Sequence, residues 1–339
     1  MITFMSVVRI MFHYFGSYVS LVIISTGIVG NLLSIVVFFN RRRQDRASAQ
    51  YLGLLAVVDL TNLSLIALHF WFHMNLHIVS NGRFSYDKFT GSAWGCKFLM
   101  YGWNVVSFLS SWIIISFSIE RCLVIWFPLR MAPIVSSSKP RKMALGSLVA
   151  FAGIVFLTDF PWMTMRAMVP GQPHHQSCSW RTDISTLEIT IHLFLSLGAS
   201  NAIPCVLVTI LNGLLLVGIR YNRMDKEVAT NASKTDMRCV RNLLLVSTFY
   251  FIFMAPFCMT WAIYFPAELS GFDGYSAEAA RDFGEVALFT TSFTYLNYSI
   301  NPLLYTLSLD FYRAECKRII CRIKTTKLTG NNTGVSSVQ

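Results

Sequence analysis

One acidic residue, Asp59, stands inside an otherwise apolar stretch and is the first candidate for chemistry in this chain. Asn31 and Ser110 lie in two other apolar stretches, and Asn297 and Asn301 share a fourth. On a helix, positions i and i+4 face the same way, so both asparagines can turn toward one partner. These groups are able to form a buried polar cluster around Asp59 that holds a small cation or a proton. The alternative is a satisfied hydrogen-bond network without an ion, because unpaired polar groups are costly in an apolar medium.

The second candidate is the sequence Glu120-Arg121-Cys122, at the end of a long apolar stretch. Asp236 stands at the start of a later stretch. Ion pairs from Arg121 to Glu120 and Asp236 would hold the two stretches together at one end, and breaking them would free a charged surface for a partner. The alternative is that the Arg121 side chain only snorkels into the lipid headgroups.

These residues must be positioned by seven long apolar runs. Hydrophobic residues make up 54% of the chain and charged residues 13%, which leaves little polar surface for a water-soluble globule. A helix needs about 20 apolar residues to cross a bilayer, and the predicted spans meet that length: 17–39, 50–75, 95–127, 143–165, 188–219, 240–265 and 284–307. We therefore predict an all-α membrane protein, a seven-transmembrane helix bundle.

The predicted organisation is a single domain with short ends. A short extracellular N-terminus (1–16) precedes the bundle (17–307), which is followed by an amphipathic juxtamembrane helix (308–322) and a disordered cytoplasmic tail (323–339). The first span has no cleavage signal, so we interpret it as a signal anchor.

The distribution of charge predicts the orientation. With the amino end outside, 21 of the 28 Lys and Arg residues fall on the inner loops, the inner rim and the tail. This is the positive-inside pattern, with the carboxyl end in the cytoplasm of a multi-pass plasma-membrane protein. The net charge of +11 is then a consequence of insertion in the lipid bilayer, and no nucleic-acid partner is expected.

Four cysteines carry predictions. Cys96 and Cys178 face the oxidising side, so they are the pair expected to form a disulfide bond; two free thiols are the alternative. Cys316 and Cys321 lie in the basic amphipathic segment, where S-palmitoylation would add an anchor. Two unmodified cytosolic thiols are an equal alternative there.

Prolines inside three spans predict hinges. Pro204, Pro256 and Pro302 interrupt spans five, six and seven, and Pro161 lies near the outer end of span four. An interior proline removes a helix hydrogen bond and kinks the axis. Three kinked helices would let one end of the bundle rearrange without unfolding.

Taken in order along the chain, these motifs resemble those of rhodopsin-like (class A) G protein-coupled receptors, closest to the invertebrate neuropeptide-receptor branch. The resemblance covers residues 17–322 and rests on Gly30-Asn31, Leu55-Ala56 with Asp59, Cys96 with Cys178, Glu120-Arg121-Cys122, Pro204, Pro256 and Asn301-Pro302-Leu303-Leu304-Tyr305. It implies a receptor, not an enzyme, whose extracellular ligand binds in the outer half. The inner ends then spread to admit a heterotrimeric G protein, with arrestin and a receptor kinase as further partners.

The resemblance also implies roles for single residues. The set implied for G protein coupling and switching is Glu120, Arg121, Asp236, Met254, Pro256, Asn301, Pro302 and Tyr305. The set implied for an allosteric sodium pocket is Asp59, Ser110, Asn297 and Asn301, and no other metal or cofactor is expected.

Four positions depart from the pattern of this family. They are Cys122 for the tyrosine after the arginine, Phe151 and Met254 for tryptophans, and Asn212 for an inner tyrosine. A methionine is softer and more adaptable than an indole, so the switch mechanism is expected to differ here.

Two ligand classes are disfavoured by absences. Span seven has no lysine for a retinal Schiff base, and Trp103 stands where amine receptors carry an aspartate. The expected ligand-binding residues are His69, His73, Trp103, Asn104, Ser107, Trp261, Tyr264, Thr291 and Tyr295. Apolar rings mixed with a few polar groups are typical of ligand sites, although ordinary helix packing explains many such residues.

A small peptide is the favoured ligand, and other functions stay open. The first alternative is a chemosensory or lipid-type receptor of the same fold. The second is a transporter or channel that uses Asp59 and Asp159, but Asp159 lies near the outer rim, far from Asp59 in depth. An intramembrane enzyme has no support, because H-E-x-x-H and G-x-S-x-G motifs are absent.

Overall fold

The structure is a computed structural model of the chain. It describes residues 14–40, 47–68, 71–72, 93–131, 138–159, 163–167, 176–180, 185–224, 231–269, 276–319 and 321. Within these ranges only the backbone is described for some residues, among them Asp236, Tyr264 and Cys178. The predicted ligand residues His69 and His73, and the predicted tail from residue 323, lie outside the described residues.

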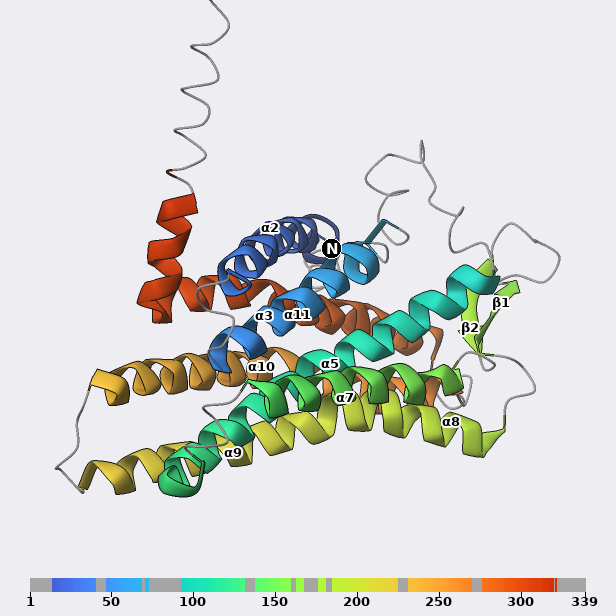
Figure 1. Cartoon of the computed structure of the whole chain (residues 1–339). Helices are drawn as coiled ribbons and strands as arrows, with labels where there is room; N and C mark the ends of the chain where they lie inside the picture. Colours follow the sequence, from blue (N-terminus) through green and yellow to red (C-terminus); the bar gives the residue numbers. More distant parts are fainter. Residues whose placement is uncertain are drawn as a thin grey trace, which may run out of the picture.

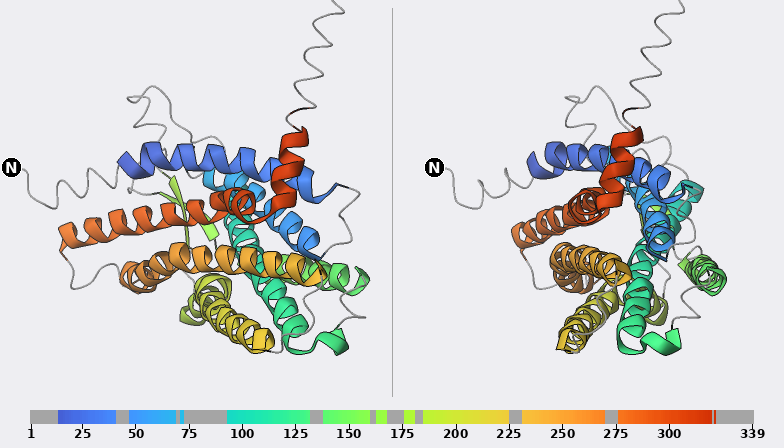
Figure 2. Two further views of the ribbon diagram at one scale, coloured as in Figure 1. Left: turned by 90° about the vertical axis from the view of Figure 1, so that its left-hand side faces the viewer. Right: turned by 60° about the vertical axis from the view of Figure 1, so that its left-hand side comes forward.

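The described residues form seven helical spans that pack side by side as one bundle (Figures 1 and 2). In chain order they are η1 (Phe15–Val19) with α2 (Ser20–Phe38); α3 (Ala47–Thr61) with η2 (Asn62–Ala67); α5 (Ala93–Trp126); α7 (Lys139–Val155) with η3 (Phe156–Asp159); α8 (Thr186–Leu193), η4 (Phe194–Ala202) and α9 (Ile203–Met224); α10 (Asn231–Leu269); and α11 (Ala277–Ser308). The predicted fold class, a seven-transmembrane helix bundle, is confirmed.

Five of the described spans are long and apolar enough to cross a membrane by length and composition alone: Ser20–Phe38, Ala49–Ala67, Trp94–Trp126, Leu187–Tyr221 and Val240–Ile263. Of the other two spans, α7 falls short by length, with 17 residues, and α11 is more polar. The α7 helix begins with Lys139, Arg141 and Lys142, and many polar side chains of α11 are buried against other helices. Burial explains how α11 can be polar without exposing those groups to lipid.

The outer end of the fourth span differs from the prediction. Residues 163–165 were expected in the span, but the helix ends at Asp159 and β1 (Met163–Ala167) pairs antiparallel with β2 (Gln176–Trp180). Pro161 has no backbone N–H and disfavours helix at the residue before it, which favours a helix end at this point. The resulting hairpin lies against the start of α5 (Figure 1) and is the exception to an all-α fold among the described residues.

Two of the proline kinks release a backbone carbonyl that another helix then uses. Pro204 cannot donate to the carbonyl of Ser200, and that oxygen accepts a hydrogen bond from Ser111 of α5 at 2.7 Å. Pro302 likewise frees the carbonyl of Tyr298, which accepts a bond from Asn31 of α2 at 2.9 Å. Each kink is therefore stabilised by a neighbour, as lipid surroundings require.

Small residues bring α2 close to α11. A Cβ atom at Gly27 would lie 2.3 Å from Ser299 Oγ, and one at Gly30 would lie 2.9 Å from the Pro302 ring. No larger side chain fits at these contacts without a shift of the helices. The close approach explains how Asn31 reaches across to the Tyr298 carbonyl.

A further helix, residues 310–319, follows α11 and turns away from it (Figure 1). The break is at Leu309, whose backbone is extended. Two side-chain hydrogen bonds attach this helix to the first span. The hydroxyls of Ser34 on α2 and of Tyr312 lie 2.8 Å apart, and Asn40, two residues after α2, donates to Glu315 at 3.0 Å. Burial raises the pKa of Tyr312 to about 12, so the hydroxyl stays protonated and able to hydrogen bond.

Candidate functional site

Asp59 lies wholly buried on α3, between α5 and α11. Its carboxylate accepts hydrogen bonds from Ser110 Oγ at 3.2 Å and from Asn301 Nδ2 at 2.7 Å. Asn297 is also buried, one turn before Asn301, as the i and i+4 spacing predicts. The carboxylate, hydroxyl and amide groups are the oxygen ligands that hard cations prefer, so the residues present fit a small cation.

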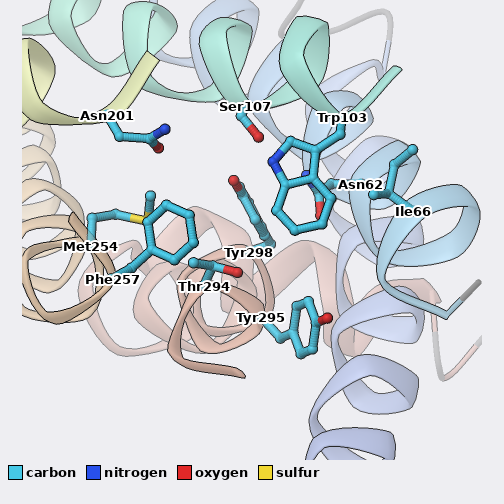
Figure 3. A pocket seen from close by; sticks show the side chains of 10 residues that line it. All are labelled: Asn62, Ile66, Trp103, Ser107, Asn201, Met254, Phe257, Thr294, Tyr295 and Tyr298. Carbon is cyan, nitrogen blue, oxygen red and sulfur yellow. The ribbon is translucent and has the colours of Figure 1, made fainter. Parts of the chain in front are cut away.

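A cavity lies next to this cluster, with Asn62, three residues after Asp59, in its wall (Figure 3). Its free volume is about 10 Å³, which is room for about one water molecule. Its described lining is Asn62, Ile66, Trp103, Ser107, Asn201, Met254, Phe257, Thr294, Tyr295 and Tyr298, contributed by η2, α5, η4, α10 and α11. None of these side chains is charged, and the Ser107 and Tyr298 side chains both point into it.

The cavity brings together some of the predicted ligand residues. Trp103, Ser107 and Tyr295 line it, whereas Asn104 is buried but is not among the described lining residues. Trp261 and Thr291 lie together elsewhere, joined by a bond from the indole N–H to the threonine hydroxyl at 3.2 Å. The positions of His69, His73 and the Tyr264 side chain lie outside the described part of the chain.

Other lining residues were missed by sequence reasoning as ligand contacts. Asn201 lies in the widened turn that precedes Pro204, and its side chain points to the cavity (Figure 3). Asn62 lies at the start of η2, three residues after Asp59. Both are asparagines inside an apolar span, next to a place where the helix widens. An asparagine in an apolar span is the sequence signal that could have found them.

Below the cavity, α5, η4 and α10 meet at a buried polar junction. The Ser111 hydroxyl lies 2.9 Å from the Tyr250 hydroxyl, 2.7 Å from the Ser200 carbonyl and 3.1 Å from the Ser107 carbonyl. Tyr250 is one turn before Met254, which lines the cavity. The junction therefore joins the cavity wall to the inner half of α10.

The end of the bundle that is predicted to face the cytoplasm, here called the inner rim, holds a dense charge cluster around Glu120. Arg121 binds its carboxylate at 2.7 Å, as predicted from the adjacent positions. Arg141 of α7 binds both carboxylate oxygens, at 2.8 and 2.9 Å, and the Tyr51 hydroxyl donates a fourth bond at 2.9 Å. Sequence reasoning missed Arg141 and Tyr51. The Asp236 side chain is not described, so its pairing with Arg121 stays a prediction.

Tyr305 lies near this rim, fully buried on α11 after the Pro302 kink. Its ring packs on Phe38 at 5.2 Å and on Tyr312 at 5.7 Å between ring centres. The inner ends of α10 and α11 are also joined, by a bond from Ser308 Oγ to Asn242 Oδ1 and one from Arg241 to the Ser308 carbonyl at 3.3 Å. Movement of α10 would have to break these contacts.

The four cysteines with predicted roles lie in three settings. Cys96 is buried and disulfide-bonded, and β2 carries Cys178 close to the same end of α5, but the Cys178 side chain is not described and the pairing stays a prediction. Cys321 is an exposed free thiol. Cys316 is half-buried, and its burial raises the pKa of the thiol.

Comparison with known proteins identifies the family. Residues 30–305 match the model of the 7 transmembrane receptor (rhodopsin family). The chain is 25% identical to neuromedin-U receptor 2 of Mus musculus, over 90% of this chain and 74% of that receptor. It is 23% identical to the thyrotropin-releasing hormone receptor of Gallus gallus, over 92% of this chain and 80% of that protein.

A third relative, C-C chemokine receptor type 3 of Macaca mulatta, is 25% identical over 87% of this chain and 76% of its own length. All three relatives are receptors, not enzymes. The family match covers most of the chain and includes the Asp59 cluster, the cavity and the inner rim. This chain belongs to the rhodopsin family of seven-transmembrane receptors, as its motifs predicted.

Proposed function

We propose that the chain converts binding of an extracellular peptide into activation of a heterotrimeric G protein. The observation that carries this is that buried contacts join the cavity wall to α5, the helix that also carries Arg121. Met254 lines the cavity, Tyr250 one turn below joins α10 to α5, and the same α5 helix carries Arg121 in its last turns. A ligand that moves α10 at the cavity would thereby act on the inner ends of the helices.

The relatives support a peptide as the ligand. The names neuromedin-U receptor and thyrotropin-releasing hormone receptor describe proteins that bind signalling peptides, and a chemokine receptor binds a small protein. In this proposal the ligand enters from the outer side, and the cavity, which has room for about one water molecule, widens to receive one end of it. The uncharged lining favours an aromatic or amide group at that end.

The remaining features of the proposal follow from this role. The receptor lies in the plasma membrane with its amino end outside, and arrestin and a receptor kinase act on its cytoplasmic face. Sodium binds at Asp59 with Ser110, Asn297 and Asn301 and stabilises the resting state. Cys178 pairs with Cys96, and palmitate is attached at Cys321 or Cys316.

The test is a ligand screen with a G protein readout. Cells that express the chain are exposed to a peptide library, and G protein activation is recorded. Arg121→Ala is expected to abolish activation while surface binding of the active peptide is retained, because the cytoplasmic contact is lost and the outer cavity is intact. Arg318→Ala, which removes an arginine from a surface ion pair with Glu315, serves as the matched control and should respond normally.

A chemosensory or lipid-type receptor is the second candidate, because the described cavity lining is uncharged and rich in aromatic rings. Activation by lipids or odorants, with no response to any peptide, would contradict the peptide ligand and favour this candidate. Ion or solute flux that survives Arg121→Ala would contradict both and favour a transporter or channel.

A further inference from the structure

The Glu120 carboxylate accepts four hydrogen bonds, and only one of them comes from Arg121. Oε1 accepts from Arg121 Nη2 at 2.7 Å and from Arg141 Nη2 at 2.9 Å. Oε2 accepts from Arg141 Nε at 2.8 Å and from the Tyr51 hydroxyl at 2.9 Å. The residue that holds Glu120 most completely is therefore Arg141, on a different helix.

The two arginines bind in different ways. Arg141 uses two nitrogens on two oxygens, and such a paired contact is stronger and more directional than a single one. Its side chain is 3% exposed, its Nη1 donates to Gln50 Oε1 at 3.2 Å, and its guanidinium lies 6.0 Å from the Tyr51 ring centre. Arg141 is thus fixed by α3 as well as by Glu120.

Arg121 bonds Glu120 through a single nitrogen and packs over the Phe117 ring at 5.5 Å. If Arg121 turns away, three of the four bonds to Glu120 remain. Without Arg141, the same turn would leave a nearly buried carboxylate with no cation, and an uncompensated buried charge is strongly unfavourable. Arg141 also repels Arg121, since both are cations on one carboxylate.

We propose that Arg141 is a positioning residue for G protein coupling. It holds Glu120 in place together with Tyr51, so that Arg121 is the exchangeable partner of this carboxylate and can turn to the G protein while Glu120 stays bonded. This inference rests on the proposed function, because it assigns Arg141 a role in the release of Arg121.

The test needs no ligand. Purified full-length receptor in lipid nanodiscs is mixed with heterotrimers of each major Gα class, and basal nucleotide exchange per receptor is measured. Arg141→Met is expected to lower exchange about threefold to tenfold, because Glu120 then holds Arg121 alone. Arg141→Lys keeps the positive charge but lacks the two guanidinium nitrogens that bind both carboxylate oxygens. Its exchange rate should therefore fall between those of Arg141→Met and the wild type.

A double-mutant cycle separates positioning from a structural role. Glu120→Gln releases Arg121 and should raise exchange. If Arg141 acts through Glu120, adding Arg141→Met to Glu120→Gln changes exchange no further. Tyr51→Phe, which removes one bond and keeps the ring, should lower exchange about twofold and provides a second variant if Arg141→Met does not fold.

Arg318→Met is the control, because it breaks an ion pair of the 310–319 helix and should leave exchange unchanged. Exchange by Arg141→Met at or above the wild-type rate, or an equal loss in the Glu120→Gln background, would overturn the role of Arg141 while leaving the receptor function in place. Absence of exchange from the wild type and from Glu120→Gln with every heterotrimer would instead overturn the proposed function, and this inference with it.

Discussion

At the scale of single residues, Asp59 offers the sharpest test of whether the receptor binds a sodium ion. A ligand that binds only the folded protein stabilises it by RT ln(1 + [L]/Kd), which is about 1.4 kcal/mol when sodium is at ten times its Kd. We expect the unfolding temperature of the wild type to rise by a few degrees in NaCl relative to KCl at equal ionic strength. Asp59→Asn, which keeps the shape but removes the charge, should lose this difference.

The control for this measurement is Asp310→Asn. Asp310 is an exposed acid paired with Arg313 on the 310–319 helix, so its loss should leave the sodium effect intact. Equal unfolding temperatures of the wild type in the two salts would argue for the ion-free hydrogen-bond network instead.

At this scale, sequence reasoning predicted correctly how two residues lie relative to each other when both are on the same helix. The four-residue spacing of Asn297 and Asn301 fixes their common face, and Arg121 follows Glu120 directly. It failed for Arg141, Tyr51 and Asn201. Which turn of one helix meets another depends on crossing angles and on side chains along the whole contact, and no spacing within one segment encodes that.

At the scale of helices, the Tyr250–Ser111 contact is the feature expected to restrain α10. Tyr250→Phe removes the hydroxyl that lies 2.9 Å from Ser111 and keeps the buried ring. A buried hydrogen bond is worth roughly 1 kcal/mol, so we expect basal nucleotide exchange to rise about threefold to fivefold. The measurement is exchange per receptor at matched surface level.

Tyr101→Phe is the matched control for this prediction. The Tyr101 hydroxyl donates to the Gly153 carbonyl at 3.0 Å and so joins α5 to α7, not to α10. It should leave exchange unchanged. A rate for Tyr250→Phe equal to or below that of the wild type would show that the junction does not hold the resting state.

Helix ends were harder to predict than helices. Apolar length located the spans, but it extended the fourth span through Pro161 into what is strand β1. It also gave no sign of the widened turns η2 and η4, or of the capture of the Ser200 carbonyl by Ser111. A hydropathy pattern records the lipid-facing surface of a helix, whereas these details are set by packing on its inner face.

At the scale of the whole molecule, the interior is partly polar. Buried polar residues gather at three levels, namely the cavity, the Ser111 and Asp59 groups, and the Glu120 cluster. Such groups restrict which helix arrangements are satisfied, because a shift of one helix leaves a donor or acceptor unpaired. This favours two discrete arrangements over gradual bending, which is what a switch requires.

The orientation of the bundle is the last prediction. With 21 of 28 Lys and Arg residues on one side, translocating that side would be costly, so the amino end is expected outside. An N-terminal tag should bind antibody on intact cells, and a C-terminal tag only after permeabilisation. Replacing Arg41, Arg42, Arg43 and Arg46 by Gln should make part of the population insert inverted, while replacing the outer Arg83 and Lys88 should not. If both tags of the unaltered chain were reached from outside, an odd number of spans would be impossible, and cavity and inner rim could not face opposite compartments.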